Sequence, residues 1–332
     1  MRSGKERPAD SRRKTGDQFY PLSDVAPGLI ANPAEGLLDL LPRWDESFAK
    51  LEQAVAGFDG AGKATLTPGA DGVRYDLLVT NPKKIVCAGM NYYCHLRKDA
   101  KREIKKEDYD CLFFLKGSDQ QLAADREIPF PSHTVKYDWE VEIVIVIGKE
   151  GRNIKAADAA QHIAGYAVGN DLSARDWQFN PRHIRQFDLV AGKAFDNAAP
   201  VGPWLVPAKF VDIENLWLKL WVNDDLKQDS TTKEMIWTVG ELIESYSSHS
   251  TLRPGDLLFT GTRGGMVTLS MDVVGAFDVQ LPYSSDVEAA AYLQAGLGHA
   301  GVDFRWFGPS VSPLVNASTE GDVLVSSVHP AG

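Results

Sequence analysis

The sequence predicts an α+β fold whose main domain is mostly β-structure. From Lys84 onward, short apolar or β-branched runs alternate with turn residues, and helical patterns are few. No dinucleotide-binding GxGxxG motif follows a strand. The chain of 332 residues exceeds an average domain, so we expect one large domain and a smaller N-terminal region.

The N-terminal third divides into a tail and a helical region. Residues 1–17 are basic and lack an apolar run, so we expect a disordered tail and no export signal. Residues 18–80 form the predicted N-terminal region. In it, Glu35–Gly57 carries a helical stripe broken at Pro42, and Tyr75–Val79 is a predicted strand.

The main domain, residues 81–332, carries the strand patterns. The predicted strands are Ile85–Ala88, Leu112–Leu115, Val141–Ile147, Gly165–Gly169, Leu216–Val222 and Leu257–Thr260. Asn223–Asp225 predicts a hairpin turn after the fifth of them. Helices are expected over Ala156–Ala164, after the capping box Thr238–Glu241, and over Asp286–Leu297.

Composition excludes several classes of protein. The formal net charge of −10 argues against a general nucleic-acid binder and against docking on an anionic membrane. No apolar run is long enough to span a bilayer. Cys87, Cys94 and Cys111 form no CxxC pair, so we expect neither a disulfide framework nor a zinc site, and a cytoplasmic location.

Two glutamates begin the most apolar strand of the chain. Alternation places Glu140 and Glu142 on the same face of the strand that ends at Ile147. Two buried neighbouring carboxylates repel each other, and a shared cation removes that penalty. Oxygen ligands select a hard ion, Mg²⁺ or alternatively Mn²⁺ or Ca²⁺. The alternative is a strand end in water, where the glutamates only protect an edge.

A third carboxylate follows the next strand. Asp171 lies at a predicted strand-to-helix turn, with Ser173 and Asp176 resembling a helix start. Arg175 and Gln178 then share one helical face and offer donors to a carboxylate or a carbonyl. The alternative is an ordinary helix cap with two exposed polar residues.

Seven ordered motifs lie between Lys84 and about residue 265. They are the Lys84–Tyr92 block, Tyr137–Glu142 with its ExE pair, Gly165–Gln178, Lys193–Asp196, Pro200–Pro203, Leu252–Asp256 and Thr260–Thr262. Together these motifs resemble the fumarylacetoacetate hydrolase superfamily. The resemblance implies a mixed β-sandwich roll, a homodimer, and a divalent metal held by Glu140, Glu142 and Asp171. The N-terminal region resembles the variable part of the family only weakly.

The resemblance also assigns residues around the metal. It implies that Lys193 neutralises a developing enolate oxygen or bridges the metal carboxylates, and that Arg175, Gln178 and Thr262 bind substrate oxygens. Without the resemblance, Lys193 is more typical of a surface lysine, and Thr260–Thr262 of a turn after a strand.

His95 stands where many family members carry a water-activating histidine with a glutamate three residues later. This chain has Lys98 at that position, and we expect Asp99 to orient the imidazole instead. A lone histidine of this kind is also compatible with a structural role.

The C-terminal part departs from the family pattern. Arg263 follows Thr262 and is either an anion contact or a surface residue. An atypical insertion covers about residues 266–320 and is either a lid or a dimer contact. It precedes a closing strand that starts after Gly321–Asp322.

These features predict an enzyme that acts on a small anionic oxo acid. The leading hypothesis is a metal-dependent hydrolase that cleaves a C–C bond in an acylpyruvate-like β-diketo acid. The alternative is a decarboxylase, hydratase or tautomerase of a 2-oxo acid, because Lys98 replaces the usual glutamate. A non-catalytic metabolite-binding homologue is the third hypothesis.

Overall fold

The core of the protein is a curled, mixed β-sheet. The computed structural model describes residues 19–31, 33–58, 63, 73–94, 105–124, 126–222, 225–263, 276–280, 292–296, 312–317 and 323–330. The strand order in the main sheet is β4-β3-β14-β7-β8-β10-β5, and β11 also pairs with β8. These strands are β3 (Ile85–Gly89), β4 (Leu112–Lys116), β5 (Gln121–Ala123), β7 (Val141–Ile147), β8 (Ile163–Asn170), β10 (Ala199–Val201), β11 (Val206–Pro207) and β14 (Leu257–Phe259). The predicted strands of this sheet are confirmed within one or two residues.

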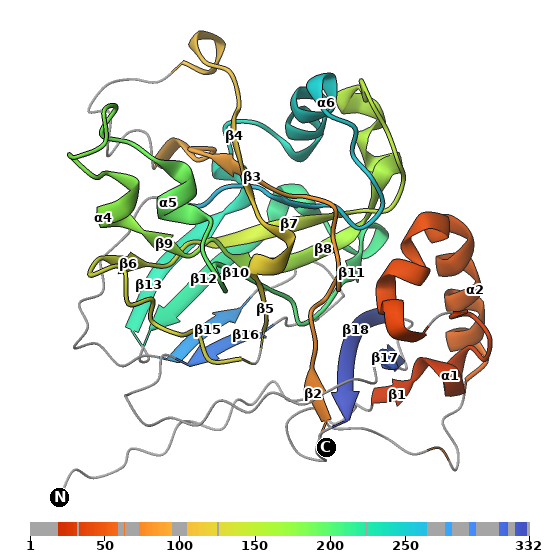
Figure 1. Cartoon of the computed structure of the whole chain (residues 1–332). Coiled ribbons are helices and arrows are strands. Elements are labelled where there is room, and N and C mark those ends of the chain that lie inside the picture. The colour runs from red at the N-terminus through yellow and green to blue at the C-terminus, as the bar shows by residue number, and fades with distance from the viewer. Residues whose placement is uncertain are drawn as a thin grey trace, which may run out of the picture.

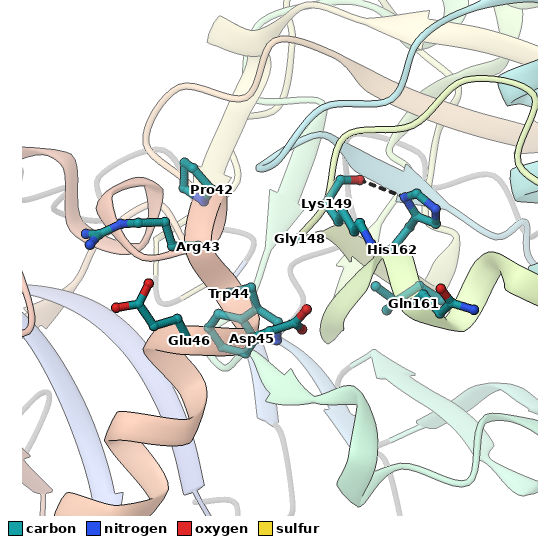
Figure 2. A pocket seen from close by; sticks show the side chains of 10 residues that line it. Pro42, Arg43, Trp44, Asp45, Glu46, Gly148, Lys149, Gln161 and His162 are labelled. Atoms are coloured by element: carbon teal, nitrogen blue, oxygen red, sulfur yellow. Dashed lines mark hydrogen bonds between the residues drawn. The ribbon is translucent and has the colours of Figure 1, made fainter.

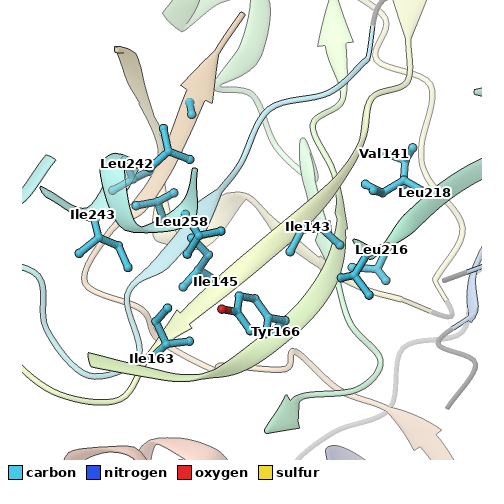
Figure 3. Packing of buried hydrophobic residues seen from close by; sticks show 14 of the residues in the cluster. Val141, Ile143, Ile145, Ile163, Tyr166, Leu216, Leu218, Leu242, Ile243 and Leu258 are labelled. Carbon is cyan, nitrogen blue, oxygen red and sulfur yellow. The ribbon is translucent and has the colours of Figure 1, made fainter. Parts of the chain in front are cut away.

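Strands β7 and β8 lie at the centre because both of their faces are apolar. Ile143 and Ile145 of β7 pack into one hydrophobic cluster, whereas Val144 and Val146 pack into the cluster on the other face. Figure 3 shows side chains of the first cluster, including Ile145 with Leu242 and Ile243 of helix α6 (Val239–His249). A strand that is buried on both faces reads as a continuous apolar run, as this one does.

The N-terminal helices cover the second cluster. They are α1 (Leu22–Val25), η1 (Pro33–Asp39), η2 (Leu41–Arg43) and α2 (Trp44–Ala56). Pro42 lies inside the short three-ten turn η2, directly before α2 begins. The predicted break in the helical pattern is therefore confirmed, since proline cannot continue a helix from the preceding residues.

A second sheet joins the two ends of the described chain. Its order is β1-β17-β18-β2, with β1 (Phe19–Pro21), β2 (Val73–Tyr75), β17 (Ser312–Ala317) and β18 (Val323–Pro330). Figure 1 shows α1 and α2 beside this sheet, and α4 (Arg175–Gln178) and α5 (Leu189–Lys193) on the other side of the molecule. The strand predicted over Tyr75–Val79 is wrong beyond its first residue, because Leu78 and Val79 are buried in a turn-rich connection.

A third sheet has the order β13-β12-β15-β16. Its strands are β12 (Trp217–Val222), β13 (Asp225–Thr231), β15 (Ala276–Gln280) and β16 (Tyr292–Gly296). The predicted hairpin between β12 and β13 is confirmed. The helix predicted over Asp286–Leu297 is wrong where the structure describes it, because Tyr292–Gly296 pairs with β15 and its backbone hydrogen bonds go to a neighbouring strand.

Two other predicted helices have different outcomes. Thr238 and Glu241 form the capping box that starts α6, as predicted. The segment Ala156–His162 is the three-ten helix η5, and β8 begins at Ile163. The α-helix predicted over Ala156–Ala164 is therefore wrong, because its last two residues belong to a strand and the others to a three-ten helix. Pairing of Ile163 with Ile147 takes the end of that segment into the sheet.

The remaining elements are short. They are β6 (Tyr137–Asp138) and β9 (Ser173–Ala174), which pair with each other, and the three-ten turns η3 (Lys106–Asp108), η4 (Ser118–Gln120), η6 (Ala208–Phe210), η7 (Ile213–Asn215) and η8 (Thr232–Glu234). The architecture is a mixed half-barrel with few helices, so the predicted mostly-β fold class is confirmed. Among the described residues, no helix is long and apolar enough to cross a membrane. The division into residues 1–17, 18–80 and 81–332 stays a prediction.

Candidate functional site

Three carboxylates meet at one end of β7 and β8. Glu140 precedes β7, Glu142 lies in it, and Asp171 follows β8. The backbone N–H of Asp171 donates to the carbonyl of Glu140 at 2.8 Å, and this hydrogen bond holds the ends of the two strands next to each other. One ligand oxygen from each residue lies within 4.8 Å of the others. Glu140 and Glu142 are only 4% and 1% exposed, so the alternative of a strand end in water is wrong.

Neighbouring backbone and amide groups fix the two glutamates. The side-chain oxygen of Asn170 accepts from the backbone N–H of Glu140 at 2.8 Å. The backbone N–H of Gly261 donates to Glu142 Oε2 at 2.7 Å. Gly261 has a φ of +91°, and a Cβ there would lie 2.8 Å from Asn91 Cβ. Only glycine therefore fits the turn that delivers this donor.

Lys193 bridges two members of the triad. It is the last residue of α5, and its Nζ donates to Glu140 Oε2 and, at 2.7 Å, to Asp171 Oδ2. Its side chain is 4% exposed, so the alternative of a surface lysine is wrong. Burial lowers the pKa of Lys193, but Asp171 and Glu140 outweigh burial and raise it overall. These two carboxylate contacts favour the ammonium form of Lys193.

Arg175 and Gln178 share one side of α4, as predicted. Arg175 Nη1 donates to Gln178 Oε1 at 2.7 Å, its Nε donates to Asp138 Oδ2 at 2.8 Å, and its Nη2 donates to Glu140 Oε1. The guanidinium thus fixes one oxygen of Glu140 while Lys193 holds the other. The side chains are not the exposed polar residues of the alternative, because Gln178 is 5% exposed.

The predicted cap of this helix is wrong. The residue before the helix is Ala174, which has no side-chain acceptor to offer. The Ser173 hydroxyl donates back to the carbonyl of Asp171 at 3.0 Å, and Asp176 accepts from Thr134 and from the backbone of Val135. Asp176 thus fastens this segment to the loop that contains Thr134 and Val135, whereas the Ser173 hydroxyl closes a local turn, and neither side chain caps the helix.

Thr262 has its hydroxyl inside a buried hydrogen-bond chain. The hydroxyl donates to the carbonyl of Val141 at 2.8 Å and accepts from Gln228 Nε2 at 3.0 Å. Gln228 Oε1 accepts from the backbone N–H of Val141 at 2.9 Å. The chain ties β13 and the Thr260–Thr262 turn to the start of β7, and a substrate contact of Thr262 stays a prediction.

The buried charges of the site favour binding of a cation. Burial, then Asp171 and Glu140, raise the pKa of Glu142 well above its ordinary value. Burial also raises the pKa of Asp138 to about 6, although Arg175 opposes it. The four buried carboxylates of this cluster face three buried cations, Lys116, Arg175 and Lys193. An oxygen donor set with excess negative charge fits a hard divalent ion.

Four residues of the site were not predicted from the sequence. Asp138 and Lys116 hold charged members of the cluster, and Gln228 holds the start of β7. Asn91 donates to the carbonyls of Trp237 and Thr260 and accepts from Trp237 N–H, which shapes the turn before Gly261. Asn91 and Asp138 lie inside the motif blocks that mark the family, whereas Lys116 and Gln228 lie outside them.

His95 and Asp99 lie outside the described residues, so their predicted roles stay predictions. So does Lys98. His133, for which no role was predicted, lies against the rings of Trp177 and Phe195.

The cavity in Figure 2 lies at the other end of the central strands. It measures about 300 Å³, and its lining includes Arg43, Trp44, Lys149 and His162. Lys149 follows the end of β7, whereas the triad is at its start, and seven strand residues span roughly 20 Å. The cavity is therefore separate from the carboxylate triad.

The fold and the site place the chain in a class of β-rich proteins with a curled mixed sheet and a buried carboxylate triad at the end of the central strands. Residues 84–296 match the family model described as fumarylacetoacetate (FAA) hydrolase C-terminal. The chain therefore belongs to the fumarylacetoacetate hydrolase family, a family of enzymes.

Relatives within the family carry out different reactions. The chain is 38% identical to the mitochondrial oxaloacetate tautomerase FAHD2B of Bos taurus, over 72% of this chain and 77% of that protein. It is 37% identical to the mitochondrial oxaloacetate tautomerase FAHD2A of Bos taurus, over 78% and 83%. A crystal structure of fumarylpyruvate hydrolase from Pseudomonas aeruginosa in complex with Mn²⁺ and pyruvate is 30% identical, covers 70% of this chain and 99% of that chain, and has a TM-score of 0.58.

Proposed function

We propose that the protein is a metal-dependent tautomerase that interconverts the keto and enol forms of a small 2-oxo dicarboxylic acid such as oxaloacetate. The buried triad of Glu140, Glu142 and Asp171 is the observation that carries this proposal. The two relatives described as oxaloacetate tautomerases support the choice of reaction. The sequence supports it too, since Lys98 replaces the glutamate that a water-activating histidine would need.

The donor set of the triad fits Mg²⁺ or Mn²⁺, and less specifically Ca²⁺. A Mn²⁺ ion is named in the related fumarylpyruvate hydrolase structure. When bound, a divalent ion supplies Lewis-acid stabilisation of an enolate. Glu140, Glu142 and Asp171 would hold it.

The chain's own residues supply binding and proton control. We assign Arg175 and Gln178 to binding of a substrate carboxylate and carbonyl, and this assignment rests on the family resemblance. Among the described residues, two acceptors surround Lys193 Nζ, which leaves one of its three N–H donors for the C2 oxygen of the substrate. In the reaction, a proton leaves C3 and a proton is added to the C2 oxygen, so no atom is gained or lost.

A second candidate function is hydrolysis of a C–C bond in an acylpyruvate-like acid. The fumarylpyruvate hydrolase neighbour favours it. In this reaction His95, oriented by Asp99, would activate water, and Lys193 would hold the departing enolate. Decarboxylation uses the same enolate and releases CO₂ as its signature.

The test uses the purified full chain with Mg²⁺ or Mn²⁺. Oxaloacetate is added as its enol form, and loss of the enol absorbance is followed against the uncatalysed rate. Pyruvate release from an acylpyruvate is measured in parallel with lactate dehydrogenase, and CO₂ is measured separately. Faster loss of enol without pyruvate or CO₂ supports the tautomerase, whereas pyruvate and a carboxylic acid in equal amounts support the hydrolase.

Variants separate the site from the rest of the chain. Glu142→Gln should abolish the catalysed rate, whereas Glu150→Gln, at an exposed position, should leave it unchanged. Full turnover in Glu142→Gln would contradict the metal site. Unchanged tautomerisation but lost hydrolysis in His95→Ala would assign that histidine to water activation alone. The predicted homodimer and cytoplasmic location stay predictions, and a mass measurement in solution tests the dimer.

A further inference from the structure

Lys116 is a second buried lysine at the triad. It ends β4, and its side chain is 0% exposed. Its Nζ lies 2.8 Å from Asp171 Oδ1, donates to the carbonyl of Leu172 at 3.3 Å, and donates to the carbonyl of Lys193. The carbonyls of Leu172 and Lys193 each accept a hydrogen bond from the ammonium, whereas the contact with Asp171 Oδ1 is an ion pair without hydrogen-bond geometry.

The contacts of Lys116 join three separate parts of the chain. β4 is the first strand in the order of the main sheet, whereas Asp171 and Leu172 follow β8, and Lys193 ends α5. Lys116 therefore holds one sheet edge to the two segments that carry a triad carboxylate and the bridging lysine. The carbonyl of Lys193 is at a helix end, where such groups need an external donor.

Asp171 is held from both sides by this arrangement. Lys193 Nζ contacts Oδ2 at 2.7 Å, and Lys116 Nζ contacts Oδ1 at 2.8 Å. A carboxylate fixed at both oxygens has little freedom to rotate, so its position relative to Glu140 and Glu142 is set before any ligand arrives.

Lys116 and Lys193 have different roles. Lys193 donates to two triad carboxylates, and we assign its third N–H to the substrate. Lys116 instead donates to two backbone carbonyls. We propose that Lys116 is a positioning residue: it fixes Asp171 and Lys193 relative to each other, and full divalent-cation affinity of the triad depends on it. This inference rests on the proposed metal site.

Electrostatics and positioning predict opposite effects when Lys116 loses its charge. Removing a positive charge beside an anionic site, taken alone, tightens cation binding. Removing a partner that orients a ligand typically weakens metal binding about 10- to 100-fold. A weaker affinity therefore indicates that Lys116 positions the metal ligands, whereas a tighter affinity indicates that it contributes only its charge.

The experiment measures Mn²⁺ binding to the full chain by titration calorimetry, with no substrate present. Lys116→Met keeps the length and apolar stem of the side chain and removes its donors. The matched control is Lys84→Met, because Lys84 contacts another buried aspartate, Asp256, at 2.6 Å. Asp256 accepts from the backbone of Lys84 and Arg253 and from no triad residue. We expect affinity to fall at least about 10-fold in Lys116→Met and to stay unchanged in Lys84→Met.

A double-mutant cycle tests whether Lys116 acts through Asp171. In an Asp171→Asn background, Lys116→Met should have little further effect on Mn²⁺ affinity. Should Lys116→Met not fold, Lys116→Gln is titrated in the same way, with the same loss expected. Unchanged or tighter Mn²⁺ binding in a folded Lys116 variant overturns the proposal. Absence of Mn²⁺ binding in the unmodified chain would instead overturn the metal site itself, so the two failures are distinguishable.

Discussion

At the residue scale, Glu142 depends on a cation more than its neighbours do. Glu140 is paired with Arg175 and Lys193, and Asp171 with Lys116 and Lys193. Glu142 accepts a hydrogen bond from Gly261 and has no ion pair within the described part of the chain. Its raised pKa follows from burial beside two carboxylates. Without a metal, this side chain is the least favourable charge of the site.

Glu142→Gln should therefore improve stability while it removes metal binding. We expect Mn²⁺ affinity to fall more than about 100-fold, since a ligand is lost and not merely an orienting partner. The metal-free variant should be at least as stable as the unmodified chain at neutral pH, because a buried charge is gone. Calorimetry measures the affinity and urea unfolding the stability. A less stable variant with retained Mn²⁺ binding would contradict both statements.

Asp138 gives a pH dependence with a defined sign. Its pKa is about 6 in the folded protein and 3.8 ordinarily, so between these values the folded state keeps a proton that the unfolded state loses. The free energy of unfolding therefore falls as pH rises from 4 to 6, and the loss is constant above 6. Asp138→Asn removes this loss, so relative to the unmodified chain it should gain about 2–3 kcal/mol between pH 4 and pH 7. Urea unfolding of both metal-free proteins across that range measures the difference.

Some residues of the site could be predicted from sequence and others could not. Alternation along one apolar strand placed Glu140 and Glu142 together, and the turn after the next strand supplied Asp171. Lys116 could not be found in this way, because its contact with Asp171 arises only when β4 reaches the segments after β8 and α5. A single lysine after an apolar strand carries no signal for such a long-range contact.

At the element scale, β8 approaches β7 closely where the triad begins. Gly169 pairs directly with Glu142. A Cβ at position 169 would lie 2.5 Å from Val144 Cγ2 and 2.5 Å from Phe259 Cε1. Both atoms belong to the packed second cluster, so they have little room to move.

Gly169→Ala should therefore affect both the sheet and the site. We expect the free energy of unfolding to fall by about 1–3 kcal/mol, as overpacking in a core does. Mn²⁺ affinity should fall as well, because Glu142 moves with its paired strand. Gly57→Ala is the control, since the nearest atoms to its added Cβ are 3.8 Å away. Urea unfolding and calorimetry of both variants would show an unfavourable change in Gly169→Ala only.

The capping box of α6 offers a local test that is independent of the site. Thr238 Oγ1 accepts from the backbone N–H of Glu241, and Glu241 accepts from the backbone N–H of Thr238. Thr238→Ala should lower the free energy of unfolding by about 1 kcal/mol. Ser248→Ala, at an exposed position of the same helix, should change it by less than about 0.5 kcal/mol. Equal effects in the two variants would contradict the capping role.

Sequence patterns predicted elements well where local and long-range preferences agree. The capping box, the β12–β13 hairpin and the apolar strand β7 each have a local signal that matches their place in the fold. Tyr292–Gly296 and Ala156–His162 do not, because pairing with β15 and the early start of β8 override a helical pattern. Periodicity in a short segment cannot reveal which neighbour will offer hydrogen bonds.

At the scale of the whole molecule, the triad links the two strands at the centre of the fold to segments from several other elements. Glu140 and Glu142 belong to the β7 segment, Asp171 follows β8, and Lys193, Lys116 and Gly261 arrive from α5, β4 and the turn after β14. A ligand that binds this cluster therefore contacts groups that are together only in the folded chain. Binding should stabilise the whole sheet and not one loop.

Divalent-metal binding should thus appear as global stability. A ligand that binds only the folded state adds about 2.7 kcal/mol to the free energy of unfolding at a concentration 100 times its Kd. We expect Mn²⁺ to raise the urea midpoint with an unchanged slope, because the surface exposed on unfolding stays the same. EDTA should reverse the shift, and Glu142→Gln should show none, although it unfolds normally. Equal stabilisation of Glu142→Gln by Mn²⁺ would place the ion elsewhere on the chain and remove the triad from the proposed chemistry.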